Sequence, residues 1–200
     1  MKKLSQASVL TKLLTGFSIL IAMMLILGAV AIYQLNASNQ HIDKFRENRM
    51  PGVRYTLEMR GVLSEMRLQQ TQYIASVTPE EREKHRVELL QNQAIFLNAQ
   101  QQYAKLSKDA PEEMRTLFNT VADNFRNFVD VNAKVIAAVS AGNLDEASKI
   151  SGAVSSKYRT QLMADLAKLV DEEVAMGDAA GKASQTGYTA ALYTFSGLLL

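Results

Sequence analysis

Two arginines, Arg60 and Arg67, are the residues whose type and spacing most directly suggest chemistry, because they lie seven positions apart in a strongly helical segment. At about 100° per residue, Arg60, Ser64, Arg67 and Thr71 fall on one polar stripe of that helix. Guanidinium groups form paired, charge-assisted hydrogen bonds with carboxylates. The stripe therefore predicts a binding site for a small organic anion, a carboxylate or an amino acid.

The same helix carries apolar residues on two sides, so it is expected to have two partners. One stripe would face the core of its own domain; it consists of Met59, Val62, Leu63, Met66 and Tyr73. The side that carries the arginines also holds Val53, Leu57, Leu68 and Ala75. This second side suits a two-fold interface, where the arginines of two copies would approach each other around an anion. The alternative is that Arg60 and Arg67 pair with Glu58, Glu65 or an acid of the last helix.

The composition favours an all-α protein. Few residues are helix breakers, with 10 glycines and 3 prolines among 200, and the common residues are good helix formers. The formal net charge of +2 and the scattered basic residues argue against nucleic-acid binding. The absence of cysteine excludes disulfides, thiolate nucleophiles and cysteine-based metal sites.

The N-terminal part predicts a membrane span. Residues 13–33 carry no charge for about 21 positions, which is enough to cross the hydrocarbon core of a bilayer. Lys2, Lys3 and Lys12 precede this run, so the positive-inside rule places residues 1–12 in the cytoplasm. The alternative is a cleaved signal peptide, because Ala29–Ala31 resembles a peptidase site.

The C-terminal part becomes apolar again after Lys182. We interpret residues 189–200 as the start of a second span, with an extracytoplasmic domain at 34–188 and the cytoplasmic output beyond the sequence. In a bacterium this domain would lie in the periplasm and the spans in the inner membrane. A secreted helical protein with an apolar tail is the alternative.

Three connections divide residues 34–188 into four helices. Thr78 as N-cap, Pro79 and Glu81 predict a helix start after an end near Ser76. A second break is expected at 107–113. Gly142 suits a helix C-terminus, and Asn143 suits the next N-cap. The expected architecture is an up-down-up-down four-helix bundle whose long first and fourth helices continue into the membrane spans.

Spacings of three and four residues predict the core stripes of the middle helices. In the second helix the stripe is Val87, Leu90, Ala94, Leu97, Gln101 and Ala104; in the third it is Met114, Phe118, Val121, Phe125, Phe128, Asn132, Val135 and Val139. The first helix is expected to kink at Pro51 and Gly52. The start of the fourth is expected to be loosened at Ser151 and Gly152.

Other chemistry has weak support. His41 and His85 are far apart, so no metal site is expected, and no cofactor is implied. Asp171–Glu173 is expected to be a surface patch. No catalytic triad, phosphate loop or paired-carboxylate cleft is recognisable, so we do not expect an enzyme. On the last helix Tyr158 and Arg159 are candidates to complete the anion site, although they also suit an ordinary polar face.

The order of tail, span, four-helix domain and second span resembles the input half of bacterial methyl-accepting chemotaxis receptors of the aspartate/serine-receptor type. The segments that carry the resemblance are "NRMPGVRYTLEMRGVLSEMR" at 48–67 and "AAVSAGNLDEA" at 137–147. The chain is also similar to the input modules of some sensor kinases and diguanylate cyclases. A membrane-anchored helical scaffold that senses nothing is the alternative from another class.

The resemblance implies a homodimer that binds its ligand between two first helices and signals to cytoplasmic partners. Arg67 matches the first of the ligand-binding arginines of the aspartate receptor. The other two arginines fall near Gln72 and Ser76, and the threonine of helix four falls near Gly152. Because these positions differ, the resemblance does not imply aspartate as the ligand.

Overall fold

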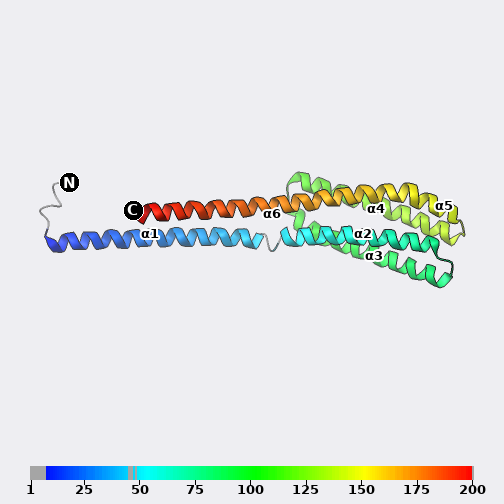
Figure 1. Ribbon diagram of the computed structural model, residues 1–200, viewed down its shortest axis with the longest axis horizontal. Helices are drawn as coiled ribbons and strands as arrows, with labels where there is room; N and C mark the ends of the chain where they lie inside the picture. Colours follow the sequence, from blue (N-terminus) through cyan, green and yellow to red (C-terminus); the bar gives the residue numbers. More distant parts are fainter. Residues whose placement is uncertain (1–7, 45–46, 48, 200) are drawn as a thin grey trace. The chain divides into compact units, whose positions relative to one another are not determined.

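The computed structural model describes residues 8–44, 47 and 49–199, so Lys2 and Lys3 of the predicted cytoplasmic tail lie outside the described residues. The described chain consists of helices and short connections, and no strand occurs in it, which confirms the all-α prediction. Two compact units are present (Figure 1). One contains residues 46–177, and the other contains residues 1–45 together with 178–200.

The unit formed by the two ends of the chain contains α1 (Val9–Lys44) and the C-terminal part of α6 (Ser156–Leu199). Residues Val9–Ala37 are long and apolar enough to cross a membrane, and no part of this stretch is buried. A signal sequence near the N-terminus has the same properties. Within the described part of the chain this is the one such stretch, and the second span at 189–200 stays a prediction.

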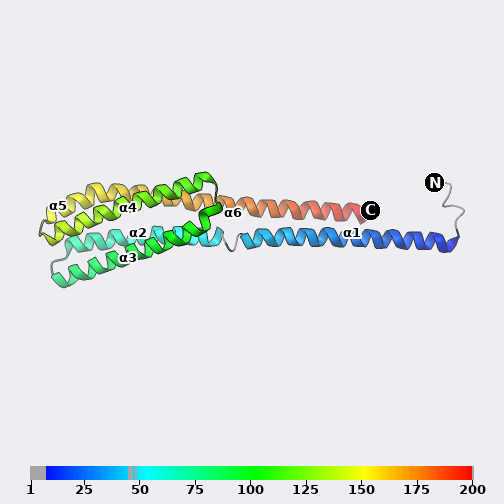
Figure 2. The ribbon, with the colours of Figure 1, turned by 180° about the vertical axis from the view of Figure 1, so that it is seen from behind.

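The unit of residues 46–177 is a four-helix bundle. Its first three helices are α2 (Met50–Ala75), α3 (Pro79–Leu106) and α4 (Glu112–Ser140). The fourth is composite: α5 (Leu144–Lys149), the π-helical segment η3 (Ile150–Ser155) and the start of α6. Figures 1 and 2 show the α2–α3 and α4–α5 connections at one end of the bundle and the α3–α4 connection, with η2 (Ser107–Asp109), at the other. The topology is therefore up-down-up-down.

Local sequence signals set the helix ends. Thr78 caps α3 by accepting a hydrogen bond from the backbone N–H of Glu81, and Asn143 caps α5 through the N–H of Glu146. Gly142 has a φ of 77°, a conformation that glycine adopts without strain. These three predictions are confirmed. Pro51 lies in the first turn of α2, where its missing N–H costs no helical hydrogen bond.

The core of the bundle forms where the predicted stripes of α2 and α4 meet. Every predicted core residue of α4 is buried, including Asn132, and so are Met59, Leu63, Met66 and Tyr73 of α2. The rings of Phe96 and Phe125 stack with their centroids 3.6 Å apart, which joins α3 to α4. Stacked aromatic rings contribute beyond the area that they bury.

The predicted core stripe of α3 is wrong. Val87, Leu90 and Leu97 are 39%, 41% and 41% exposed, and Ala94, Gln101 and Ala104 are exposed as well. The residues of α3 that are buried are Leu89, Phe96, Ala99 and Tyr103. This helix has two apolar stripes at helical spacing, and the stripe with the two large aromatic rings removes more apolar surface from water.

The π-helical segment η3 keeps the two parts of the fourth helix in register. Ala147 and Leu166 are both fully buried, yet 19 residues of uninterrupted α-helix would place them roughly 100° apart. A π-helical turn closes over one additional residue and so absorbs this offset. The segment contains Ser151 and Gly152, where the sequence predicted a loosened helix.

Candidate functional site

Arg67 of α2 is turned toward the fourth helix. Its Nη1 donates hydrogen bonds to Oε1 of Gln70 at 2.7 Å and to Oγ of Ser151 at 2.5 Å. The side chain is half-buried. Because Ser151 belongs to η3, the arginine connects α2 to the π-helical segment.

A buried network of uncharged polar groups lies beneath Arg67. Gln70 is fully buried; its Nε2 donates to Oδ1 of Asn132 and to Oγ of Ser155, the latter at 3.0 Å. The hydroxyl of Ser151 donates to Oε1 of Gln70 at 2.8 Å. Buried polar groups of this kind fix a single arrangement when they are satisfied. The Nδ2 of Asn132 has no partner among the described residues.

Arg159 of α6 brings a second positive charge to Arg67. Burial, followed by the nearby charge of Arg159, holds the pKa of Arg67 below its usual value. The Nε of Arg159 is buried and has no hydrogen-bond partner in the described part of the chain. Neither arginine forms an ion pair with a described residue. Arg67 therefore does not form the ion pair with Glu58 or Glu65 that was the alternative to an anion site.

The remaining predicted site residues of α2 face outward. Arg60 is half-buried and has no ion pair among the described residues. The hydroxyls of Ser64 and Thr71 are exposed and donate to carbonyls of their own helix, those of Arg60 and Arg67. Tyr158 of α6 packs against the hydrophobic core. The structure thus brings Arg67 and Arg159 together and leaves Ser64 and Thr71 directed to solvent.

Gln70 and Ser151, the immediate partners of Arg67, were not predicted. Gln70 carried a signal, because it continues the buried stripe of Leu63, Met66 and Tyr73 at spacings of four and three. A glutamine at such a position must find polar partners on the facing helix. Ser151 carried none, since its orientation depends on the π-helical turn.

A second polar cluster joins α2, α3 and α6 and corrects one prediction. Asp171 and Glu172 are exposed as expected, but Glu173 is only 4% exposed. Its carboxylate accepts hydrogen bonds from Tyr103 at 2.9 Å and from Arg49 at 3.3 Å. It is buried because α2 approaches it closely: a Cβ at Gly52 would lie 2.8 Å from its Oε1.

Glu173 also perturbs the phenol that it binds. Burial, followed by the negative charge of Glu173 and the hydrogen bond to it, raises the pKa of Tyr103 far above its usual value. The cluster is a structural tie between helices, because each of its charges has a partner.

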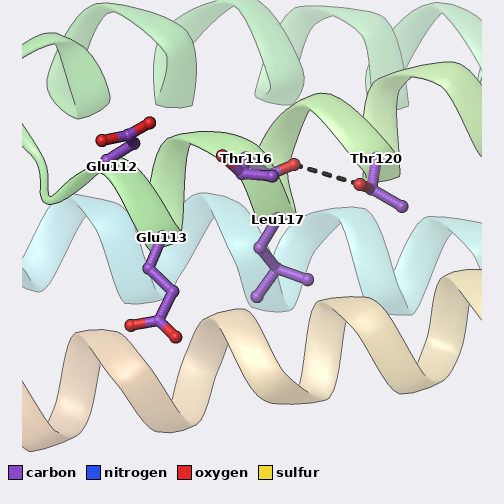
Figure 3. A pocket seen from close by; sticks show the side chains of 5 residues that line it. All are labelled: Glu112, Glu113, Thr116, Leu117 and Thr120. Carbon is purple, nitrogen blue, oxygen red and sulfur yellow. Dashed lines mark hydrogen bonds between the residues drawn. The ribbon is translucent and has the colours of Figure 1, made fainter.

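Two surface depressions near the start of α4 are lined by none of the residues of the Arg67 network or the Glu173 cluster. One, of about 540 Å³, opens at the start of α4 and is lined by Glu112, Glu113, Thr116, Leu117 and Thr120 (Figure 3). Its polar residues are all exposed, and Figure 3 shows Thr120 bonded back to Thr116 of the same helix. A neighbouring depression of about 560 Å³ extends toward Lys108 and Arg115. Neither contains a predicted site residue.

Of the two histidines, His85 has a described side chain, and its polar contacts are with residues other than Arg67 and Arg159. His85 contacts Oε1 of Gln69 through its Nδ1 at 2.7 Å, whereas the side chain of His41 lies outside the described residues. The described residues contain no group of three or more potential metal ligands.

Comparison with known proteins gives one match. No curated protein and no solved structure matches the chain. The model of a family described as a four helix bundle sensory module for signal transduction matches residues 6–188. This range includes the bundle, both polar clusters and all of α1, and it agrees with the resemblance to the N-terminal sensory part of a chemotaxis receptor. The chain belongs to this family of four-helix-bundle sensory modules for signal transduction.

Proposed function

We propose that the chain is the ligand-sensing and transmembrane signalling input of a bacterial chemoreceptor, and that its bundle binds a small organic anion at Arg67 and Arg159. One observation carries the proposal: two neighbouring guanidinium groups from different helices have no carboxylate partner among the described residues. Like charges at close range repel, and a bound carboxylate relieves this repulsion through charge-assisted hydrogen bonds. The bundle has no catalytic role in this proposal.

In this proposal the ligand-bound protein is a homodimer, and the anion site lies near its two-fold interface. Leu57 and Leu68 of α2 are 47% and 49% exposed, and they share their side of the helix with Arg60, Ser64 and Thr71. A second copy of α2 would cover these leucines. It would also bring a second set of arginines close to the first, so the anion would stabilise the dimer.

The proposed signal leaves through α6, which continues without interruption to Leu199. Residues 13–33 and the segment that starts at 189 would cross the inner membrane, with residues 1–12 in the cytoplasm and 34–188 in the periplasm. A displacement of about 1–2 Å along a packed helix is within the usual range of signalling transitions. A cytoplasmic output domain, of the chemoreceptor, kinase or cyclase type, would receive it.

Titration calorimetry on the detergent-solubilised chain tests the ligand assignment. Succinate, citrate and free amino acids are the first compounds to titrate. For the ligand that binds, Arg67→Ala and Arg159→Ala are expected to lower the affinity about ten- to a hundredfold, because each removes a charge-assisted contact of roughly 1.5–3 kcal/mol. Lys84→Ala, in the exposed charged run of α3, is the control and should leave the affinity unchanged. A carboxylate that binds equally well to both arginine variants would place the site elsewhere.

A further inference from the structure

The anion site and the π-helical segment share one contact, which is the hydrogen bond from Arg67 to Ser151. Nη1 of Arg67 lies 2.5 Å from Oγ of Ser151 and 3.5 Å from the backbone oxygen of the same residue. Ser151 is buried, at 4% exposure, and stands in the second position of η3. The guanidinium that would receive an anion is therefore already engaged by the fourth helix.

We propose that Ser151 is a built-in competitor for Arg67, so that anion binding withdraws the guanidinium from η3 and releases the π-helical segment. This inference rests on the proposed function and concerns how the same site is regulated. In the ligand-free protein Arg67 clamps Ser151; in the bound protein its donors turn to the carboxylate, which also accepts from Arg159.

The charges in the site favour the exchange. Arg67 donates only to uncharged oxygens, those of Gln70 and Ser151. A carboxylate adds the attraction of a full opposite charge and can accept two parallel hydrogen bonds from one guanidinium. A carboxylate would also face Arg159, which has no ion pair among the described residues. When a ligand carboxylate takes the place of the Ser151 hydroxyl as the partner of Arg67, a weaker contact is therefore exchanged for a stronger one.

The segment that would be released depends on its outside contacts. A π-helical turn has poorer hydrogen-bond geometry than the α-helix on either side and occurs frequently at functional sites. Here Gln70 and Arg67 of α2 hold its two buried serines, Ser151 and Ser155, from one side. Loss of the Arg67 contact removes the charged one of these two α2 residues, so that Gln70 is the one residue of α2 that still holds the serines.

Thermodynamic reciprocity sharpens the test. If anion binding loosens η3, then loosening η3 must strengthen anion binding by the same factor. Ser151→Ala removes the competing hydroxyl and retains Arg67 and Arg159. It is expected to tighten the binding of succinate or citrate about tenfold, which corresponds to one hydrogen bond to a charged group. Val154→Ala shortens an exposed side chain of the same segment that is not part of the buried network, so the affinity should change less than twofold.

Hydrogen exchange measured by mass spectrometry reports on the segment itself and does not need a ligand. Arg67→Met is expected to raise amide exchange at 150–155 about tenfold in the ligand-free chain, because it removes the clamp. Arg54→Met, on the exposed side of the same helix, should not. If Arg67→Met does not fold, Ser151→Ala provides the same measurement from the other side of the contact. Unchanged exchange at 150–155 in the folded variant overturns the clamp.

The two proposals fail differently. If succinate or citrate binds but exchange at 150–155 stays the same and Ser151→Ala does not tighten binding, the proposed function stands and the competition is wrong. If succinate, citrate and free amino acids all fail to bind to the wild type and to Ser151→Ala, both the carboxylate assignment and the competition are wrong. Faster exchange on ligand addition, together with tighter binding by Ser151→Ala, supports both.

Discussion

The phenolic oxygen of Tyr103 lies 2.9 Å from Oε1 of Glu173, and this hydrogen bond joins α3 to α6 inside the bundle. The other carboxylate oxygen accepts from Arg49, the N-cap residue that directly precedes α2. One buried side chain of α6 therefore holds two other helices. This arrangement is independent of the proposed anion site and permits separate tests of the fold.

Removal of the Glu173 carboxylate is expected to destabilise the bundle. Glu173→Ala leaves the Tyr103 hydroxyl unpaired in the core and should lower the free energy of unfolding by about 2–3 kcal/mol. Glu173→Gln retains an acceptor for Tyr103 and should cost less. Urea unfolding followed by circular dichroism measures both effects. Glu172→Ala, at the exposed neighbouring position, is the matched control, and an equal loss there would mean that the tie contributes nothing specific.

The same hydrogen bond predicts a loss of stability at alkaline pH. The pKa of Tyr103 is raised in the folded protein, so the folded state holds this proton more tightly than the unfolded state does. Its contribution is fully present below the ordinary tyrosine pKa of about 10 and is lost as the pH rises above that value. Between pH 9 and 11 the free energy of unfolding should fall by up to about 1.4 kcal/mol per pH unit from this residue.

Tyr103→Phe is expected to remove this part of the pH dependence. Tyr188→Phe changes an exposed tyrosine, so this variant should keep the pH dependence of the wild type. Denaturant unfolding of the three proteins at several pH values gives the comparison. Parallel profiles for the wild type and Tyr103→Phe would contradict the raised pKa.

Two adjacent residues of α3 test which stripe of this helix is buried. Phe96 is fully buried against Phe125, so Phe96→Ala should lower the free energy of unfolding by about 3–5 kcal/mol through lost burial and a cavity. Leu97 is 41% exposed, so Leu97→Ala should cost less than about 1 kcal/mol. Thermal or urea unfolding distinguishes them, and a larger effect at Leu97 would restore the stripe that the sequence predicted.

Two glycines should respond to alanine in opposite directions. Gly142 has a φ of 77°, so Gly142→Ala should destabilise by about 1–2 kcal/mol. Gly61 lies within α2, and a Cβ there would meet nothing within 4 Å. Gly61→Ala should therefore stabilise the bundle by about 0.5–1 kcal/mol. The two midpoints of unfolding should move to opposite sides of that of the wild type.

The sequence predicted those features that depend on neighbouring residues. Thr78 and Asn143 cap helices because their side chains bond to residues three positions away, and α4 has a single apolar stripe that admits one orientation. Features that depend on distant segments were missed. The orientation of α3 was decided by the partner of Phe96, and the burial of Glu173 by the glycine opposite it.

The candidate site follows the same division. Arg67 was identified from its spacing on one helix. Its proximity to Ser151 and Arg159 depends on how the fourth helix is rotated, which the π-helical turn sets. No residue type in Ile150–Ser155 prescribes such a turn. Its presence follows from the requirement that Ala147 and Leu166 both face the interior of the bundle.

That turn also makes the fourth helix unusually tolerant of a change in length. Deletion of Gly152, an exposed residue with open space around it, would leave Ala147 and Leu166 separated by 18 positions, which is five full α-helical turns. The segment could then close as ordinary α-helix with both apolar faces still on the core, whereas deletion of Ala164 would rotate one part away by about 100°. Natural variants shorter by one residue are thus expected to carry their gap at 150–155, and an alignment of such chains would reveal the π-helical turn without a structure.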